Sequence, residues 1–312
     1  MKRCPITYEA IAAEEDYSER GLRLLSPQLK NLSPLEMSAA ELRLEAIARA
    51  GKMSIQGVQT KLSAQLKIKE HQFQLVDNNG RYILKTQSEY YPQLPENEAI
   101  TMSLAAAIDI EVPTHGLVYS KDNSMTYFIK RFDRAGQHKK LAVEDFTQLS
   151  GLDRDTKYES SMEKVANVIA NYCTFPKIEF VKLLKLTLFN FLVGNEDMHL
   201  KNFSLITRNN TVTLSPAYDL LNSTIAQENS QEEIALPIHG RKNNLTKRDF
   251  IDYFASERLE LNQTVITEVI QKIQQALPGW QQLIRHSFLS KAMQQRYLDL
   301  LQARCKRLHL LE

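Results

Sequence analysis

The sequence predicts an α+β protein of two lobes, a small β-rich lobe followed by a larger and mostly helical one. Between about residues 59 and 129, apolar and polar residues alternate in short runs, as in half-buried strands. Past Arg134, apolar residues recur every three or four positions, as in helices. With 312 residues, 43% of them hydrophobic, the chain is long enough to bury a substantial core.

The first 50 residues predict short helices that pack onto the next unit. Apolar residues such as Leu42, Leu44 and Ile47 recur at helical spacing, and Pro27 and Pro34 interrupt the pattern. We therefore expect three parts in the chain: a helical segment over 1–50, an N-lobe with a phosphate loop over 51–130, and a helical C-lobe over 131–312.

Within the N-lobe the pattern predicts a hairpin, a helix and a second hairpin. Alternating runs over 62–68 and 73–76 lead to Asn78-Asn79-Gly80, a turn signal that predicts a return strand over 82–85. Residues 96–109 have helical spacing. The second hairpin is expected over 116–119 and 125–129.

The C-lobe pattern predicts mainly helices. The clearest cover 159–172 and 178–193, the second ending at Gly194 as a carboxyl cap. A strand pair is expected over 204–207 and 212–215, and further helices over 246–311 with a break at Pro278-Gly279.

Composition excludes several function classes. The 39 basic and 37 acidic residues nearly cancel, which argues against a protein whose main task is to coat nucleic acid or an anionic membrane. No apolar stretch approaches the roughly 20 residues of a membrane helix, and no signal core follows the amino terminus. We expect a cytoplasmic protein that does not associate with membranes.

The chemistry is expected at Asp197-x-x-x-x-Asn202. This is the spacing at which a loop aspartate accepts a hydroxyl proton while an asparagine five residues later reaches a metal ion, and Lys201 adds positive charge toward a transferred phosphate. Taken alone, the pair also fits an ordinary loop of capping and turn-forming residues. His199 is expected to brace this loop by hydrogen bonding.

A second aspartate supplies the context. Asp219 directly follows the predicted strand pair, so Asn202 and Asp219 are candidate ligands that hold magnesium between them. The alternative role for Asp219 is a helix N-cap before Leu220 and Leu221.

Candidates for phosphate binding lie upstream. Lys85 ends an apolar strand, and Glu98, with Glu96 as the competing choice, is available to orient it. The segment Ser54-Ile-Gln-Gly-Val-Gln-Thr-Lys61 can cover phosphates through backbone N–H groups of Gly57, Val58 and Gln59 and through the Lys61 side chain, although it is neither a GxGxxG nor a Walker sequence.

In their order, SIQGVQTK, YILK, FIKRFDR, NEDMHLKNFS and LSPAYDLL resemble the HipA family of bacterial toxin kinases. The resemblance implies a bilobal protein-kinase-like fold with ATP and Mg²⁺ as cofactors. It makes Asp197 the catalytic base, Asn202 and Asp219 the magnesium ligands, and Lys85, Lys61 and Gly57 the phosphate contacts.

The resemblance also implies features that periodicity does not give. Backbone groups of Lys130 and Phe132 would meet the adenine, and Asp133 would face the ribose. Ser54 falls at the family's inhibitory autophosphorylated serine, where a phosphate of charge about −2 would pull the loop from its nucleotide-binding conformation.

Only about 50 residues precede Ser54, so the sequence resembles a short HipT-like branch in which a separate small protein supplies a missing subdomain. The implied function is a serine/threonine protein kinase of a toxin–antitoxin system that acts on an aminoacyl-tRNA synthetase or a similar translation protein. An antitoxin or a small accessory subunit is the expected partner, and DNA is expected only through such a partner. The alternative is a small-molecule or lipid kinase, because these share the DxHxxN skeleton.

Overall fold

The computed structural model describes residues 2–50, 60–136, 139–152, 156–227 and 232–311. The fold is α+β, and the chain divides into two compact units. The first comprises Met1–Ile100, Pro113–Arg134 and Arg285–Ser290, and the second comprises Thr101–Val112, Ala135–Ile284 and Lys291–Glu312. Each unit is described by itself. No helix of the described ranges has the length and apolar character that crossing a membrane requires.

The first unit is built on an antiparallel sheet of five strands in the order β4-β3-β5-β7-β6. Its strands are β3 (Lys61–Lys67), β4 (Gln72–Leu75), β5 (Tyr82–Lys85), β6 (His115–Tyr119) and β7 (Met125–Lys130). Before them come a two-stranded ladder and two helices: β1 (Lys2–Arg3), β2 (Ala10–Ile11), α1 (Glu19–Leu25) and α2 (Ala39–Ala50). Helix α3 (Leu94–Ala106) begins in this unit and ends in the second.

The turn at Asn78-Asn79-Gly80 does not close the predicted hairpin. Strands β4 and β5 both pair with β3, one at each of its edges, so the turn carries the chain past β3 instead. The backbone passes so close that a Cβ at Gly80 would lie 1.9 Å from Ser63 Oγ and 3.1 Å from the Ala64 nitrogen. The hairpin prediction was wrong because a local turn signal does not reveal which neighbour a strand will choose. The second predicted hairpin, β6 with β7, is confirmed.

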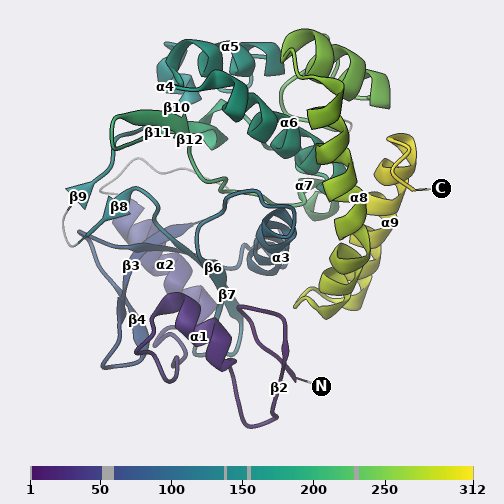
Figure 1. The fold of residues 1–312 in the computed structure, drawn as a ribbon. Coiled ribbons are helices and arrows are strands. Elements are labelled where there is room, and N and C mark those ends of the chain that lie inside the picture. Colours follow the sequence, from purple (N-terminus) through teal and green to yellow (C-terminus); the bar gives the residue numbers. More distant parts are fainter. Residues whose placement is uncertain (1, 51–59, 137–138, 153–155, 228–231, 312) are drawn as a thin grey trace. The chain divides into compact units, whose positions relative to one another are not determined.

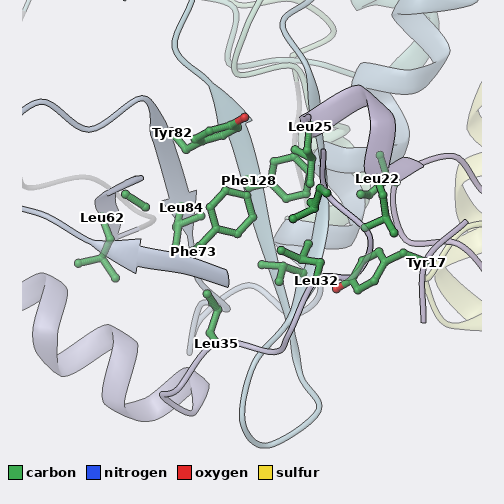
Figure 2. Packing of buried hydrophobic residues seen from close by; sticks show 14 of the residues in the cluster. Tyr17, Leu22, Leu25, Leu32, Leu35, Leu62, Phe73, Tyr82, Leu84 and Phe128 are labelled. Carbon is green, nitrogen blue, oxygen red and sulfur yellow. The ribbon is translucent and has the colours of Figure 1, made fainter. Parts of the chain in front are cut away.

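One face of this sheet is covered by the first 46 residues. Figure 2 shows Tyr17, Leu22, Leu25, Leu32 and Leu35 packed against the sheet side chains Leu62, Phe73, Tyr82, Leu84 and Phe128. Side chains alternate along a strand, so Tyr82 and Leu84 face this core and Lys85 faces the other side of the sheet. Leu44 and Ile47 of α2 are exposed. The amino-terminal segment thus packs on the face of the sheet opposite to Lys85.

The second unit is mostly helical (Figure 1). Its helices are α4 (Phe146–Leu149), α5 (Met162–Tyr172), α6 (Pro176–Val193), the 3₁₀ turn η1 (Leu200–Asn202), α7 (Ser223–Ala226), the π-helix η2 (Asp249–Arg258), α8 (Gln263–His286) and α9 (Lys291–Arg307). Three strands form a small sheet in the order β10-β11-β12: β10 (Val143–Asp145), β11 (Ser204–Arg208) and β12 (Thr211–Leu214). A further ladder pairs β8 (Arg134–Ala135) with β9 (Lys139–Lys140).

Helix α8 corrects a second prediction. It runs without a break through Pro278 and Gly279 (Figure 1), where the sequence predicted an end. Proline removes one backbone donor and favours a kink, but burial of Leu277, Trp280 and Ile284 along one face holds both halves to the same core. Packing therefore outweighs the local cost.

Helix α6 and the small sheet place the central loop. Pro176 occupies the first turn of α6, where no partner for its missing N–H is needed, and Gly194 ends the helix in the left-handed region at φ 74°. The predicted strand pair is confirmed as β11 and β12. Residues 195–203 are consequently held between the end of a buried helix and the start of a strand.

Candidate active site

In the first unit, Lys85 is held by a buried ion pair. Its Nζ lies 2.5 Å from Glu98 Oε1, and the two side chains are only 5% and 2% exposed. The ammonium also lies 5.5 Å from the centre of the Tyr127 ring, on the neighbouring strand. A lysine fixed in this way cannot swing freely, as a group that must point at phosphates requires.

Glu96, the competing partner, has a different environment. Its two carboxylate oxygens accept hydrogen bonds of 2.8 and 3.0 Å from Gln87 Nε2. Burial raises the pKa of Glu96 to about 7, and the Gln87 hydrogen bonds offset only part of that effect. Glu98 is therefore the carboxylate that orients Lys85.

Lys61 lies directly opposite Lys85 in the register of β3 and β5. Lys61 is exposed and Lys85 is buried. Opposed residues of an antiparallel pair project from the same face of the sheet, so both lysines arise on the face away from the amino-terminal core. The other predicted residues of the phosphate loop, Ser54, Gly57, Val58 and Gln59, lie outside the described residues.

The segment after β7 contains the predicted adenine contacts. The Lys130 N–H donates to the Thr114 carbonyl at 2.8 Å, which leaves only the carbonyl oxygen of Lys130 as a group for a base. Asp133 accepts hydrogen bonds from Arg131 at 2.7 and 3.0 Å and from Arg134. Burial acts to raise the pKa of Asp133, but the two arginines hold it below its ordinary value. The Asp133 carboxylate is thus occupied by Arg131 and Arg134. Phe132 lies between Arg131 and Asp133 in the sequence.

In the second unit, the loop after α6 is anchored at its start. Thr224 donates to the Gly194 carbonyl at 3.1 Å from both its backbone N–H and its hydroxyl. Glu196 accepts hydrogen bonds from Thr224 Oγ1 at 2.5 Å and from Arg304 Nη2 at 3.4 Å. Arg304, on α9, is 5% exposed and also donates to the carbonyl of Phe191 at 2.5 Å. These contacts fix the path of the chain into Asp197.

Asp197 and Asn202 are held together within one turn. Asn202 Nδ2 donates to the Asp197 carbonyl at 2.9 Å, as does the N–H of His199 at 2.8 Å. Because the amide nitrogen of Asn202 is used in this way, its Oδ1 is left for other partners, and oxygen is the atom that a hard cation binds. The Asp197 side chain remains 47% exposed.

His199 is buried beside this turn and contacts both Lys157 and Asp197. It is 6% exposed, and its Nε2 accepts a hydrogen bond of 2.8 Å from Lys157 Nζ and lies 3.9 Å from Asp197 Oδ1. Burial and the Lys157 charge lower the pKa of His199, while Asp197 and Asp219 act to raise it. The neutral form of the imidazole is therefore favoured, and it accepts a hydrogen bond from the Lys157 ammonium.

Tyr158 is the most direct neighbour of Asp197. Its hydroxyl donates to Asp197 Oδ1, and its ring stands edge-on to His199 with the ring centres 5.1 Å apart. Burial, followed by this hydrogen bond, raises the pKa of Tyr158. The sequence reasoning missed Tyr158 and Lys157, because both come from a loop about 40 residues upstream that has no motif of its own.

Asp219 follows β12 in an irregular segment and adopts a left-handed conformation with φ 54°. The residue before it, Tyr218, donates to the Lys201 carbonyl at 2.9 Å and shares a 2.5 Å hydrogen bond with Ser204 Oγ. The hydrogen bonds of Tyr218 therefore tie the segment that carries Asp219 to the segment that carries Lys201 and Asn202. In the described part of the chain, no carboxylate lies within 4 Å of the Lys201 ammonium.

The segment that carries these residues matches a known protein family. The model of the HipA-like C-terminal domain matches residues 53–280, which include every candidate residue named above except Arg304. The chain belongs to the HipA-like family. A putative kinase of Haemophilus influenzae is 30% identical to it across 93% of this chain and 92% of that protein.

Other HipA-like relatives are longer. The serine/threonine-protein kinase toxin HipA of Shewanella oneidensis is 29% identical over 60% of this chain and 47% of the relative, so the match covers about half of that toxin. The putative kinase Y4dM of Sinorhizobium fredii is 31% identical over 73% of this chain and 59% of the relative.

Solved structures show the same fold. A complex of Shewanella oneidensis HipA with HipB and operator DNA contains a chain that matches 89% of this one with a TM-score of 0.69 and 22% identity. The Helicobacter pylori proinflammatory kinase CtkA matches 76% of it with a TM-score of 0.54 and 16% identity. The predicted α+β, kinase-like fold of this HipA-like chain is confirmed.

Proposed function

We propose that this HipA-like protein is an ATP- and Mg²⁺-dependent serine/threonine protein kinase. The observation that carries the proposal is the loop 197–202, which leaves the Asp197 carboxylate half exposed while its own carbonyl fixes Asn202. Phosphoryl transfer needs little beyond positioning and neutralisation of charge, and this loop supplies a base and a metal ligand at a fixed separation.

The residues fit a magnesium site. Asn202 offers an amide oxygen and Asp219 a carboxylate, and Mg²⁺ is usually bound by one or two such groups together with substrate phosphates and water. When bound, the ion would neutralise charge on the phosphates. The described residues contain no cluster of three His, Cys, Asp or Glu side chains. Lys85, oriented by Glu98, would contact the phosphates, and Lys201 would add positive charge near the transferred group.

The base would act through one oxygen. Asp197 Oδ1 already accepts a hydrogen bond from Tyr158, so Oδ2 is the atom that would receive the proton of a serine or threonine hydroxyl. His199 would keep the loop in place, and the carbonyl of Lys130 and the backbone of Phe132 would face the adenine. Asp133, already paired with two arginines, would support that segment.

The proposed substrate and partners follow from what is named for two similar proteins. The named Shewanella relative is a serine/threonine-protein kinase toxin, and the solved complex contains HipB and DNA. We propose that this chain acts in the cytosol within a toxin–antitoxin system, phosphorylates an aminoacyl-tRNA synthetase or similar translation protein, and inhibits itself by autophosphorylation at Ser54. An antitoxin or a small accessory subunit would bind it, and DNA would join only through that partner.

The test uses mass spectrometry after incubation of the purified protein with Mg·ATP. We expect phosphate on the parent protein and none on Asp197→Asn, which keeps the size of the side chain and removes its basicity. The matched control is Asp252→Asn, an exposed aspartate of η2, which should behave as the parent. Equal phosphate content in the parent and in Asp197→Asn would contradict the proposal.

A second measurement separates the kinase classes. Labelled phosphate from γ-labelled ATP should enter protein bands of a bacterial lysate only when Asp197 is intact. Transfer to small polar acceptors alone would favour a small-molecule or lipid kinase. Loss of the phosphate in Ser54→Ala, with transfer to other proteins retained, would assign the self-modification to Ser54.

A further inference from the structure

A pocket lies within the second unit, and the loop residue Asn202 forms part of its wall. The empty space within the pocket and at its open mouth is about 590 Å³, solvent at the mouth included. Its walls come from residues 109–111, from α6, and from residues 202–204 and 214–217. The apolar part is formed by Ile110, Leu186, Phe203, Leu214, Pro216 and Ala217.

Four charged side chains line the pocket, and three of them are already neutralised. Asp109 pairs with Lys272 at 2.6 Å, Glu111 pairs with Arg208 at 3.2 Å, and Lys182 pairs with Glu179 at 2.9 Å. Each of these pairs is satisfied by a partner that does not line the pocket. Three of the four charged side chains are therefore compensated by ion pairs with residues outside the pocket.

Lys185 is the exception. Its Nζ makes a single long contact of 3.5 Å with the Asp109 carbonyl, and no carboxylate of the described residues lies within 4 Å of it. Burial lowers the pKa of Lys185, and the nearby Asp109 carboxylate, itself paired with Lys272, offsets only part of that effect. An anionic group at Lys185 would supply the remaining compensation.

We propose that this pocket binds a small organic anion, with its carboxylate, phosphate or sulfonate group at Lys185 and an apolar body against Phe203 and Leu214. An apolar lining with one charged group at its edge is the usual composition of a small-molecule site. A charge-assisted hydrogen bond to Lys185 would fix the orientation of the ligand, and the apolar walls would supply most of the buried area.

Some of the residues that line the pocket belong to the proposed catalytic segments or adjoin them. Coupling between the pocket and Mg·ATP rests on the proposed function. Asn202 lines the pocket, and Ala217 donates to the Glu111 carbonyl at 2.7 Å two residues before Asp219. A ligand in the pocket would therefore contact Asn202 and the segment 214–217 that leads to Asp219. Binding there would alter the affinity for Mg·ATP, and Mg·ATP would alter the affinity for the ligand by the same factor.

The test uses 1-anilinonaphthalene-8-sulfonate as the probe, because it joins an aromatic body to one anionic group. Its fluorescence titration should show a dissociation constant at least about tenfold higher for Lys185→Met than for the parent, the loss expected for a hydrogen bond to a charged group. Lys185→Arg, which keeps the charge, should restore binding. The matched control is Lys177→Gln on the same helix, whose partner Glu260 lies outside the pocket.

A neutral probe completes the test. N-phenyl-1-naphthylamine has the same aromatic body without the sulfonate, so its affinity should be the same for the parent and for Lys185→Met. Equal affinity of the sulfonate probe for the parent and Lys185→Met, with both proteins folded by circular dichroism, would overturn the proposal.

The coupling is measured separately. Saturating sulfonate probe should change the dissociation constant for Mg·ATP at least about threefold in the parent and not in Lys185→Met, a coupling within the usual range. An unchanged constant would overturn the coupling alone. A protein that binds the probe but transfers no phosphate would overturn the proposed function and leave the pocket standing.

Discussion

The two units hold their candidate charged groups in opposite ways. In the first unit, Lys85 and Glu98 form an ion pair in which both side chains are almost fully buried. In the second unit, Asp197 is 47% exposed and is held mainly through its backbone. The difference matches the two tasks proposed for them, because a phosphate-binding lysine must keep one direction while a base must remain open to a protein hydroxyl.

Stability and activity should be linked at the Lys85–Glu98 pair and largely separate at the Asp197 side chain. A buried ion pair is costly to break, since removal of one partner leaves the other charged and without compensation. An exposed carboxylate carries no such cost, so a change of the Asp197 side chain itself should affect phosphate transfer with little effect on folding.

The largest effect is expected for Lys85→Met. It leaves Glu98 buried without a partner, so the free energy of unfolding should fall by about 3–5 kcal/mol. The double variant Lys85→Met with Glu98→Leu removes both charges and should recover most of that loss, while phosphate transfer is absent in both. Urea denaturation measures the first quantity, and a double variant as unstable as the single one would show that the pair is not the cause.

Arg304→Met should have the next largest effect. Arg304 donates to the Phe191 carbonyl and pairs with Glu196, and both Arg304 and Glu196 are buried. Loss of its charged hydrogen bonds should lower the free energy of unfolding by about 2–3 kcal/mol and reduce phosphate transfer by displacing the start of the loop. Arg307→Met, on the same helix but 39% exposed, is the control and should cost less than about 1 kcal/mol.

Glu96→Gln tests the acid that lies two residues from Glu98. Burial raises the pKa of Glu96 to about 7, above its value of roughly 4.3 in an unfolded chain, so the folded state binds this proton more tightly. The stabilisation is fully present below about pH 4, declines as the pH rises toward 7 and is lost above it, at a cost of up to about 4 kcal/mol. Thermal unfolding should therefore show Glu96→Gln more stable than the parent at pH 8 and similar to it at pH 4. An equal difference at both pH values would contradict this account.

The smallest effect is expected for Tyr158→Phe. The variant removes the hydroxyl that donates to Asp197 Oδ1 and keeps the ring beside His199. Because one hydrogen bond to a charged group contributes about 1.5 kcal/mol, the rate of phosphate transfer should fall up to about tenfold with the KM for ATP unchanged. Steady-state kinetics with Mg·ATP measures both values, and a rise in KM alone would assign Tyr158 to nucleotide binding instead.

Local sequence predicted the parts of the fold whose causes are local. The strand pairs 116–129 and 204–214 and the end of α6 at Gly194 follow from alternation, turn residues and a left-handed glycine, which need no distant partner. The pairing of β4 and the continuity of α8 through Pro278 did not follow. Both depend on what the segment packs against, and a window of a few residues does not contain that information.

The sequence by itself determined the order of the candidate groups, from Lys85 and Glu98 to Asp197, Asn202 and Asp219, because a fixed spacing along one loop or strand is a local property. Only the tertiary structure decided that Glu98 rather than Glu96 orients Lys85, and that Lys157, Tyr158 and Arg304 surround the Asp197 loop. These partners come from segments about 40 to 110 residues away. Their meeting is set by burial and by charge compensation in the folded core, which spacing along the chain does not record.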